Sequence, residues 1–322
     1  MPLVYFSGSL GSTSHRPRFI DMCEARLLSC HGDYLNTAKR WLADAHVHVR
    51  AKERFIMLDS GAFTSWSRGE HTTLEEVKRN YRKIVDTYAP FYKTIYLINL
   101  DVIPGKKGVT PTRKQVAQAL IESDENYEKL NKEFGNVVLP VFHQGESPQR
   151  LLEVTKQNPE YICVSPRNDL SERSRVPWAR NSNNGIVPLF EEVAEPIPKV
   201  PAHGLAATGV DMMLATGYFS VDSATWVQVA GFGGIMVQTP QGMSIIRISS
   251  DSPERRFYGH HYDNVPRDIK LIIETQADDI GASIDELRTT PGGREWFNLN
   301  TLNAVSDRPT RNAYAQHTLW EL

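Results

Sequence analysis

The fold of this chain is decided by one stretch, residues 203–226, which reads HGLAATGVDMMLATGYFSVDSATW. A Gly-Leu turn at residues 204–205 ends one short strand-type segment. Asp222 directly follows another such segment, Tyr218–Val221. Between them, around Val210–Ala215, the pattern is helical. A strand, a helix and a second strand in this order form the unit from which parallel sheets are built.

The same alternation continues through most of the chain. We predict eight strands, most of them followed by a helix: Leu3–Ser7, Phe55–Leu58, Thr94–Leu100, Val137–Phe142, Tyr161–Ser165, Val200–Gly204, Tyr218–Val221 and Gly234–Gln238. Eight repeats predict an α/β protein with a closed (β/α)8 TIM barrel rather than an open sheet. No Gly-x-Gly-x-x-Gly follows the first strand, which disfavours a dinucleotide-binding domain.

The pattern divides the chain into two parts. Residues 1–240 are expected to form the TIM-barrel catalytic domain, with a long first crossover over residues 9–54. Residues 241–322 are expected to form a small C-terminal helical appendage packed on the barrel. It would start with a hairpin around Pro240 and continue in helices near Val265–Gln276 and Ile284–Ser306.

Composition is typical of an ordinary globular protein. The 322 residues are 40% hydrophobic and 23% charged, and the net charge is −2, so any nucleic-acid contact must come from a local basic patch. The three cysteines form an odd set, which favours reduced thiols in a cytoplasm. No apolar run reaches the roughly 18 residues that cross a bilayer, so we expect no membrane association. No Cys-x-x-Cys or His-Glu-x-x-His occurs, and we predict no metal site.

Two carboxylates are expected at the mouth of the barrel. Asp59 follows Phe55–Leu58, and Asp222 follows Tyr218–Val221. Residues just past the strand ends of a parallel barrel face one common cavity. Glycosyl transfer needs two acids so placed, one to attack or stabilise a sugar cation and one to move a proton. The alternative for Asp59 is a carboxylate that only caps an Asp-Ser-Gly turn.

Three other strand ends carry groups suited to a flat heterocycle. Asp101 can accept two parallel N–H bonds from the edge of a guanine-like ring. Gln144 can donate to a ring carbonyl and accept from a ring N–H. The turn His203-Gly204-Leu205 can offer backbone groups to a base, with no side chain at residue 204 to block it. The alternatives are a turn carboxylate, a solvent-facing glutamine and an ordinary strand-to-helix turn. For His143, a packing or hydrogen-bonding role is favoured over a catalytic one.

The order of these elements, over about residues 55–226, resembles the tRNA-guanine transglycosylase superfamily. The His-Gly-Leu-Ala turn and the element Val221–Trp226 are similar to those of virus-borne members that place 7-deazaguanines in DNA. The resemblance implies that Asp222 is the nucleophile and Asp59 the general acid/base. It also implies which residues hold the purine: Asp101, Gln144 and Gly204, with Leu205 and Ser60 beside it.

Two departures from the superfamily favour DNA over tRNA. The tRNA enzymes carry a zinc site of three Cys and one His near the C terminus, whereas this chain has no cysteine after residue 239, so we expect no zinc subdomain. Ala62 also stands where they have the second glycine of Asp-Ser-Gly-Gly-Phe. The expected reaction exchanges guanine in double-stranded DNA for a free 7-deazaguanine, such as 7-cyano-7-deazaguanine, through a covalent Asp–sugar intermediate and without a cofactor.

The polynucleotide is expected to lie on basic residues in and beside the polar segment 168–199. These are Arg167, Arg173, Arg175 and Arg180, with Trp178 among them. Arg255 and Arg256 form a second candidate surface, and the alternative for both is a solvated loop. The sequence leaves open whether the chain forms a homodimer.

Three rival functions stay open. The first is a tRNA base-exchange enzyme, and the second is a non-catalytic nucleic-acid-binding partner subunit. The third is a metabolic barrel enzyme for a small phosphorylated substrate, which needs a Gly-rich loop after the late strands. The candidate Gly231-Phe-Gly-Gly234 precedes the last predicted strand and is better explained as a helix-to-strand turn.

Overall fold

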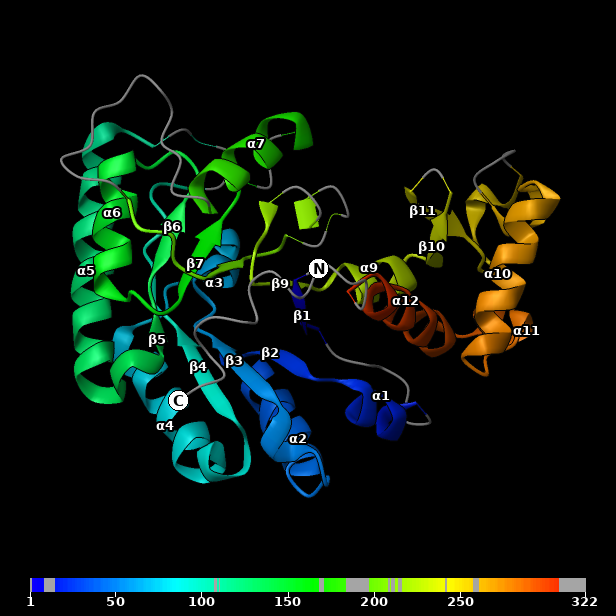
Figure 1. The fold of residues 1–322 in the computed structure, drawn as a ribbon, viewed down its shortest axis with the longest axis horizontal. Helices are drawn as coiled ribbons and strands as arrows, with labels where there is room; N and C mark the ends of the chain where they lie inside the picture. The colour runs from blue at the N-terminus through cyan, green and yellow to red at the C-terminus, as the bar shows by residue number, and fades with distance from the viewer. Residues whose placement is uncertain are drawn as a thin grey trace.

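The computed structural model describes residues 2–8, 15–106, 109, 111–167, 171–183, 197–207, 209, 212–213, 216–240, 242–256 and 261–306. Its centre is a parallel sheet whose order is β5-β4-β3-β2-β1-β9-β8-β7-β6 (Figure 1). The strands are β1 (Leu3–Phe6), β2 (Ala25–Ser29), β3 (Phe55–Asp59), β4 (Thr94–Ile98), β5 (Val138–Leu139), β6 (Val141–His143), β7 (Ile162–Ser165), β8 (Ala202–Gly204) and β9 (Ser220–Ser223).

One strand interrupted by a proline closes this sheet into a barrel. The two ends of the sheet, β5 and β6, are separated only by Pro140, which has no N–H to give to a ladder. On one side Asn99 N donates to Leu139 O, and on the other Cys163 N donates to Pro140 O. Because β5 and β6 are two halves of one strand, the nine named strands of the described chain make a barrel of eight strands. The predicted TIM-like barrel is confirmed.

One of the eight predicted strands was wrong. The segment Gly234–Gln238 is not a barrel strand: β10 (Gly234–Thr239) pairs antiparallel with β11 (Gly242–Arg247) outside the barrel. The barrel strand that the sequence analysis missed is β2, which lies inside the predicted long crossover. Arg26 hides this strand in the sequence, but its guanidinium is buried and donates to the carbonyls of Phe6 and Gly8.

Helices follow most strands and cover the outside of the barrel, with α5 and α6 along one side (Figure 1). Their bounds are α1 (Arg16–Met22), α2 (Tyr34–Ala45), α3 (Ala62–Arg68), α4 (Leu74–Tyr88), α5 (Arg113–Phe134), α6 (Pro148–Gln157), α7 (Glu172–Asn183) and α9 (Thr225–Gly231). The longest, α5, begins with a capping box in which Thr112 and Gln115 satisfy each other's backbone N–H. No helix in the described residues is long and apolar enough to cross a membrane.

Apolar side chains fill both faces of the sheet. Those that point into the barrel form one cluster: Tyr5, Ala25, Leu27, Met57, Ile98, Leu139, Val141, Tyr161 and Cys163. The alternate strand positions, such as Ile56 and Leu58, pack outward against the helices. The barrel interior is therefore a packed core, and room for a ligand is expected only at its ends.

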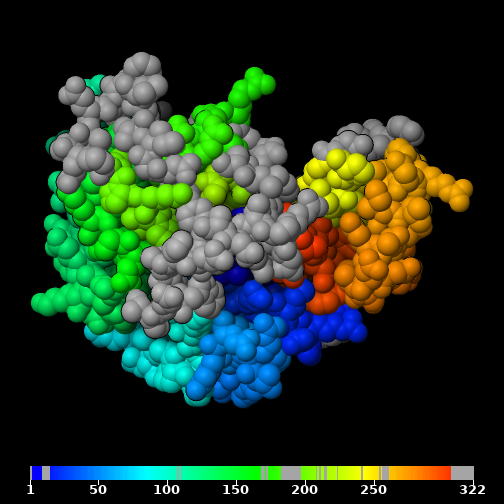
Figure 2. Space-filling model, viewed as in Figure 1, coloured from blue at the N-terminus to red at the C-terminus, as the bar shows by residue number. Residues whose placement is uncertain are grey.

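The C-terminal elements form a lobe beside the barrel, drawn in yellow, orange and red in Figure 2. They are the hairpin β10–β11 and the helices α10 (Arg267–Asp279), α11 (Ile284–Thr289) and α12 (Pro291–Ser306), so the helical appendage is confirmed. Fully buried Asn298 joins α12 to the barrel: its Oδ1 accepts from Met236 N at 2.6 Å, and its Nδ2 donates to Trp226 O at 2.9 Å. The predicted boundary at residue 240 falls in the turn of the hairpin.

Candidate active site

The residues that point into the barrel change from apolar to polar at the carboxyl ends of the strands. Phe55 and Met57 of β3 face the barrel interior, so Asp59, the next residue on that face, points inward at the strand end. Asp222 lies next to Tyr5 in the register of β1 and β9, and Tyr5 also belongs to the interior cluster. Both predicted acids therefore reach the end of the barrel where barrel enzymes bind substrates.

Asp59 behaves as an acid that can exchange a proton near neutral pH. Burial raises its pKa to about 6; the N–H of Gly61 opposes this rise, and the charges of Asp222 and Asp101 add to it. Three of the predicted site residues, Asp59, Asp101 and Asp222, are therefore within electrostatic reach of one another. A carboxyl group with such a pKa can both give and accept a proton at physiological pH.

Asp222 is held through one carboxylate oxygen. Oδ1 accepts a hydrogen bond from Ala206 N at 2.9 Å and lies 3.2 Å from Nε2 of His203. Ala206 adopts a left-handed backbone (φ 50°), uncommon for a residue with a side chain, to present its N–H. No described residue donates a hydrogen bond to Oδ2. The carboxylate therefore has one fixed oxygen and one oxygen left for chemistry.

Asp101 is paired with His143, a residue that the sequence favoured for packing or hydrogen bonding rather than for catalysis. Oδ2 of Asp101 lies 2.9 Å from Nε2 of His143, which ends strand β6. Burial of the imidazole opposes its protonation, but the carboxylates of Asp101 and Glu146 outweigh burial and raise the pKa of His143. The histidine therefore fixes one oxygen of Asp101 at the end of the barrel.

The other predicted base-binding residues lie at neighbouring strand ends and are tied to the protein. Gln144 accepts a hydrogen bond at Oε1 from Arg167 N at 3.0 Å, and no described residue accepts from its Nε2. Buried Ser60 donates to Asn99 O at 3.1 Å, which joins the ends of β3 and β4. Ser60 therefore acts in the described structure as a link between two strands of the site.

The predicted turn His203-Gly204-Leu205 wraps Asp222. Leu205 N donates to Val164 O at 2.9 Å, so this N–H is used inside the protein. A Cβ at Gly204 would lie 2.6 Å from the ring of Tyr218, which explains the glycine by packing. The side chain of His203 is fully buried beneath Asp222, where it contacts the carboxylate and not the open end of the barrel.

Several residues around the acids were not singled out from the sequence. His31 follows the missed strand β2 and lies against Gly61 so closely that a Cβ there would be 2.3 Å from the His31 Cβ. Gly61 itself has φ 82°, a conformation that favours glycine. Phe63, in the first turn of α3, is 58% exposed, and its ring lies 5.8 Å from that of Trp66. An aromatic residue two positions after an Asp-Ser-Gly turn was a signal available in the sequence.

The predicted basic surface is only partly assembled by α7. Arg173 and Arg180 are exposed and seven residues apart, so two helical turns place them on one face. Arg167 is exposed near the end of β7, and Arg175 is half-buried. Trp178 stacks on Phe142 with ring centres 5.7 Å apart, and this contact attaches α7 to the barrel.

The second predicted basic surface is neutralised by an acid. Arg255 Nε donates to Asp263 Oδ2 at 2.7 Å, and Arg288 also pairs with Asp263. These partners hold the pKa of Asp263 well below its usual range, with Arg288 the stronger influence. The side chain of Arg256 lies outside the described residues.

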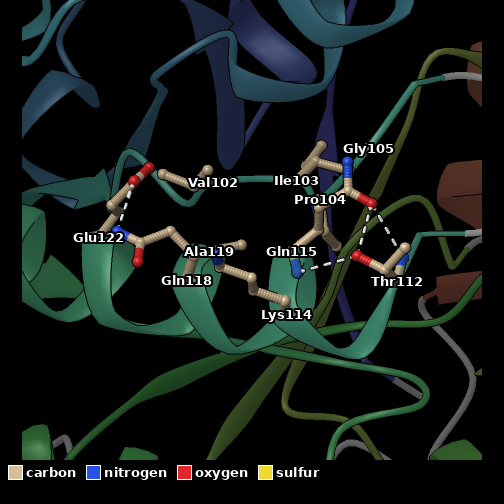
Figure 3. A pocket seen from close by; sticks show the side chains of 10 residues that line it. All are labelled: Val102, Ile103, Pro104, Gly105, Thr112, Lys114, Gln115, Gln118, Ala119 and Glu122. Atoms are coloured by element: carbon tan, nitrogen blue, oxygen red, sulfur yellow. Dashed lines mark hydrogen bonds between the residues drawn. The ribbon is translucent and has the colours of Figure 1, made fainter.

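A hollow of about 300 Å³ lies on the flank of the site (Figure 3). It separates the segment after Asp101 from the first turns of α5, and Lys114, Gln118 and Glu122 point along it. Trp66 Nε1 donates to Gly105 O at 3.0 Å and so ties α3 to the same segment. The hollow thus borders the loop that carries Asp101.

No family model matches this chain, and no curated protein matches its sequence. Among the described residues, no group of three or more His, Cys, Asp or Glu side chains could hold a metal ion. The geometry of the strand ends is therefore the basis for assigning a function.

Proposed function

We propose that this chain is a base-exchange transglycosylase of the tRNA-guanine transglycosylase type, which replaces guanine in double-stranded DNA with a free 7-deazaguanine. The observation that carries the proposal is the pairing of two differently held acids at one barrel end. Asp222 has one fixed oxygen and one to which no described residue donates, and the pKa of Asp59 is about 6. A nucleophile and a proton-transfer group are what exchange at a glycosidic carbon requires.

In the first half-reaction, Oδ2 of Asp222 attacks C1′ of the target nucleoside as the C1′–N9 bond breaks. Protonated Asp59 gives its proton to the departing guanine, which leaves as the neutral base. The product is an ester between Asp222 and the sugar, formed through an oxocarbenium-like transition state. The Ala206 N–H stays on Oδ1 throughout and keeps the carboxylate from rotating.

In the second half-reaction, a free 7-deazaguanine takes the place of guanine. Asp59, now a carboxylate, accepts the N9 proton of the incoming base, and N9 attacks C1′ as the ester bond to Asp222 breaks. Two inversions give net retention at C1′. One glycosidic bond replaces another and Asp59 returns to its protonated form, so the cycle needs no nucleotide triphosphate.

Recognition of the base is assigned to groups that fit the edge of guanine. Charged Asp101, held by His143, accepts two parallel N–H bonds from the amino and ring N–H groups. Nε2 of Gln144 donates to the ring carbonyl. The exposed ring of Phe63 offers a surface on which the flat base can stack.

Duplex DNA hides C1′ inside the stack, so the target nucleotide must be flipped out at a cost of a few kcal/mol. Arg173 and Arg180 on one face of α7 are placed to hold phosphates beside the flipped nucleotide. Net charge of the chain is only −2, so this local contact has to supply the electrostatic attraction.

The test is exchange of labelled guanine into duplex DNA and into tRNA, measured side by side. The unaltered protein should label DNA, and Asp222→Ala should lower the rate by about 10⁴-fold or more. Asp86→Ala, which removes an exposed carboxylate on α4, serves as the matched control. Label in tRNA alone would assign the tRNA reaction instead, and binding of DNA without any exchange would favour a non-catalytic partner subunit.

A further inference from the structure

A line of buried polar side chains runs from Asp222 into the apolar interior of the barrel. Nε2 of His203 lies 3.2 Å from Asp222 Oδ1, and its Nδ1 lies 2.6 Å from Ser220 Oγ. The hydroxyl of Tyr161 in turn contacts Ser220 Oγ. All three side chains are at most 1% exposed. Tyr161 belongs to the apolar cluster that fills the barrel, together with residues such as Met57 and Ile98.

One arrangement of donors gives every proton of this line an acceptor among the described residues. A carboxylate accepts only, so Nε2 of His203 carries the proton that points at Asp222. Burial raises the pKa of Tyr161 well above its usual value, so its hydroxyl keeps its proton and donates to Ser220. Ser220 then gives its own proton to Nδ1. A doubly protonated ring would leave the Ser220 proton without an acceptor among the described residues.

We propose that His203 is a positioning residue, held by Ser220 and Tyr161 as a neutral Nε2–H tautomer so that it fixes the Asp222 carboxylate for attack through Oδ2. The inference rests on the proposed role of Asp222 as the nucleophile. A neutral ring donates a hydrogen bond to Oδ1 without forming an ion pair that would weaken the carboxylate as a nucleophile. The ring of Tyr5 meets that of His203 edge to face at 5.3 Å and restricts its rotation.

The cost of burying this line supports a role beyond packing. Polar groups inside an apolar core add stability only when every donor and acceptor is satisfied, and an apolar core of the same shape does as well or better. The line ends on one oxygen of one carboxylate and makes no other described contact at its polar atoms. Its effect is therefore directed at Asp222.

The first test reads the tautomer in the free protein. Nitrogen NMR of ¹⁵N-histidine-labelled protein, with His203→Gln used to assign the signal, should show a protonated Nε2 and an unprotonated Nδ1 at pH 7. Ser220→Ala should move His203 toward a mixture of tautomers. A protonated Nδ1 in the unaltered protein, whether in the other tautomer or in an imidazolium, would overturn the inference.

The second test separates positioning from folding. Ser220→Ala and Tyr161→Phe should lower kcat by about 10-fold, leave KM for the free base unchanged, and shift the acidic limb of the kcat–pH profile to higher pH. His203→Gln, whose amide N–H can replace Nε2–H, should retain more activity than His203→Leu. Tyr96→Phe is the matched control, since the Tyr96 ring contacts that of Tyr161 but its hydroxyl lies outside the line.

The outcomes distinguish this inference from the proposed function. If Asp222→Ala abolishes exchange while Ser220→Ala and Tyr161→Phe behave like Tyr96→Phe, the function stands and the positioning role is overturned. If the unaltered protein exchanges no base, the proposed function fails and the positioning role fails with it, whereas the NMR result still decides whether His203 donates to Asp222.

Discussion

Asp59 ends strand β3, Asp222 lies one residue before the end of strand β9 of the same barrel, and the charge of Asp222 helps to raise the pKa of Asp59. This coupling separates two chemically identical side chains into different roles. Asp222 is held by the Ala206 N–H and His203 and is suited to attack, whereas Asp59 has a pKa of about 6 and is suited to proton transfer. Two acids held in such different environments are typical of catalytic acid–base pairs in enzymes.

Replacing Asp59 should reduce activity and increase stability. The pKa of this group is about 6 in the native state and about 3.9 in an unfolded chain, so it favours the native state most below pH 4 and loses that effect as the pH rises through 6. Asp59→Asn removes a desolvated charge and should raise the free energy of unfolding at pH 8 by about 1–2 kcal/mol. This figure is below the ~3 kcal/mol of a two-unit shift because Asp59 is partly exposed.

Denaturant unfolding at pH 8 and pH 4 measures this effect. The gain should shrink to a small fraction at pH 4, where the native carboxyl is protonated and the carboxyl of the unfolded chain is about half protonated. Asp86→Asn on the exposed face of α4 is the control and should change neither value. An Asp59→Asn protein that is less stable at pH 8 would show that the carboxylate is not strained by burial.

Replacing Asp101 should weaken binding of the free base specifically. Asp101→Asn keeps the shape but turns an N–H toward two N–H groups of the base, so KM for the free deazaguanine should rise at least about 100-fold. The same variant should lose discrimination against hypoxanthine, which lacks the exocyclic amine. Steady-state exchange with both bases measures the change, and an unaltered preference would remove Asp101 from base recognition.

Removing the arginines of α7 should weaken binding to all DNA sequences alike. Arg173→Ala with Arg180→Ala should reduce the slope of log affinity against log salt by about 2, one unit for each lost phosphate contact. Lys132→Ala, an exposed change in the last turn of α5, should leave the slope unchanged. Fluorescence anisotropy over a salt series provides the measurement, and equal slopes for all three proteins would place the DNA elsewhere.

Replacing Asn298 should loosen the C-terminal lobe. Asn298→Ala leaves the buried Met236 N–H without the acceptor it has in the structure, removes the bond to Trp226 O, and should cost about 3 kcal/mol of unfolding free energy. Asn300→Ala is the control on the same helix. Among the described residues, this half-exposed side chain bonds the carbonyl of Trp296 alone, and its loss should cost less than about 1 kcal/mol. A similar loss for both variants in thermal or denaturant unfolding would contradict this account of the lobe.

The barrel could be predicted from the sequence because strands and helices alternate in it with distinct periods. The wrong strand shows the limit of that pattern. Gly234–Thr239 is as apolar as a barrel strand, so the hydrophobic pattern cannot distinguish a buried barrel strand from a buried hairpin strand. Strand β2 was missed because Arg26 interrupts it, and only the fold shows that backbone carbonyls of Phe6 and Gly8 satisfy that charge.

The acids of the candidate site could be predicted because they directly follow strand-type segments. Their supports could not. Ser220 and Tyr161 lie one layer deeper in the barrel and resemble ordinary strand residues, and the pairing of His143 with Asp101 joins residues 42 positions apart. Which strands become neighbours decides such contacts, and that information is absent from local sequence.

Mass spectrometry of nucleosides from the DNA and tRNA of cells that express this chain together with a supply of 7-cyano-7-deazaguanine tests the central claim most directly. The account predicts a deazaguanine nucleoside in the DNA of cells with the unaltered chain, and none in cells with Asp222→Ala at equal protein level. Deazaguanine in DNA at the same level with both proteins would contradict base exchange through Asp222, as would its absence from DNA in both.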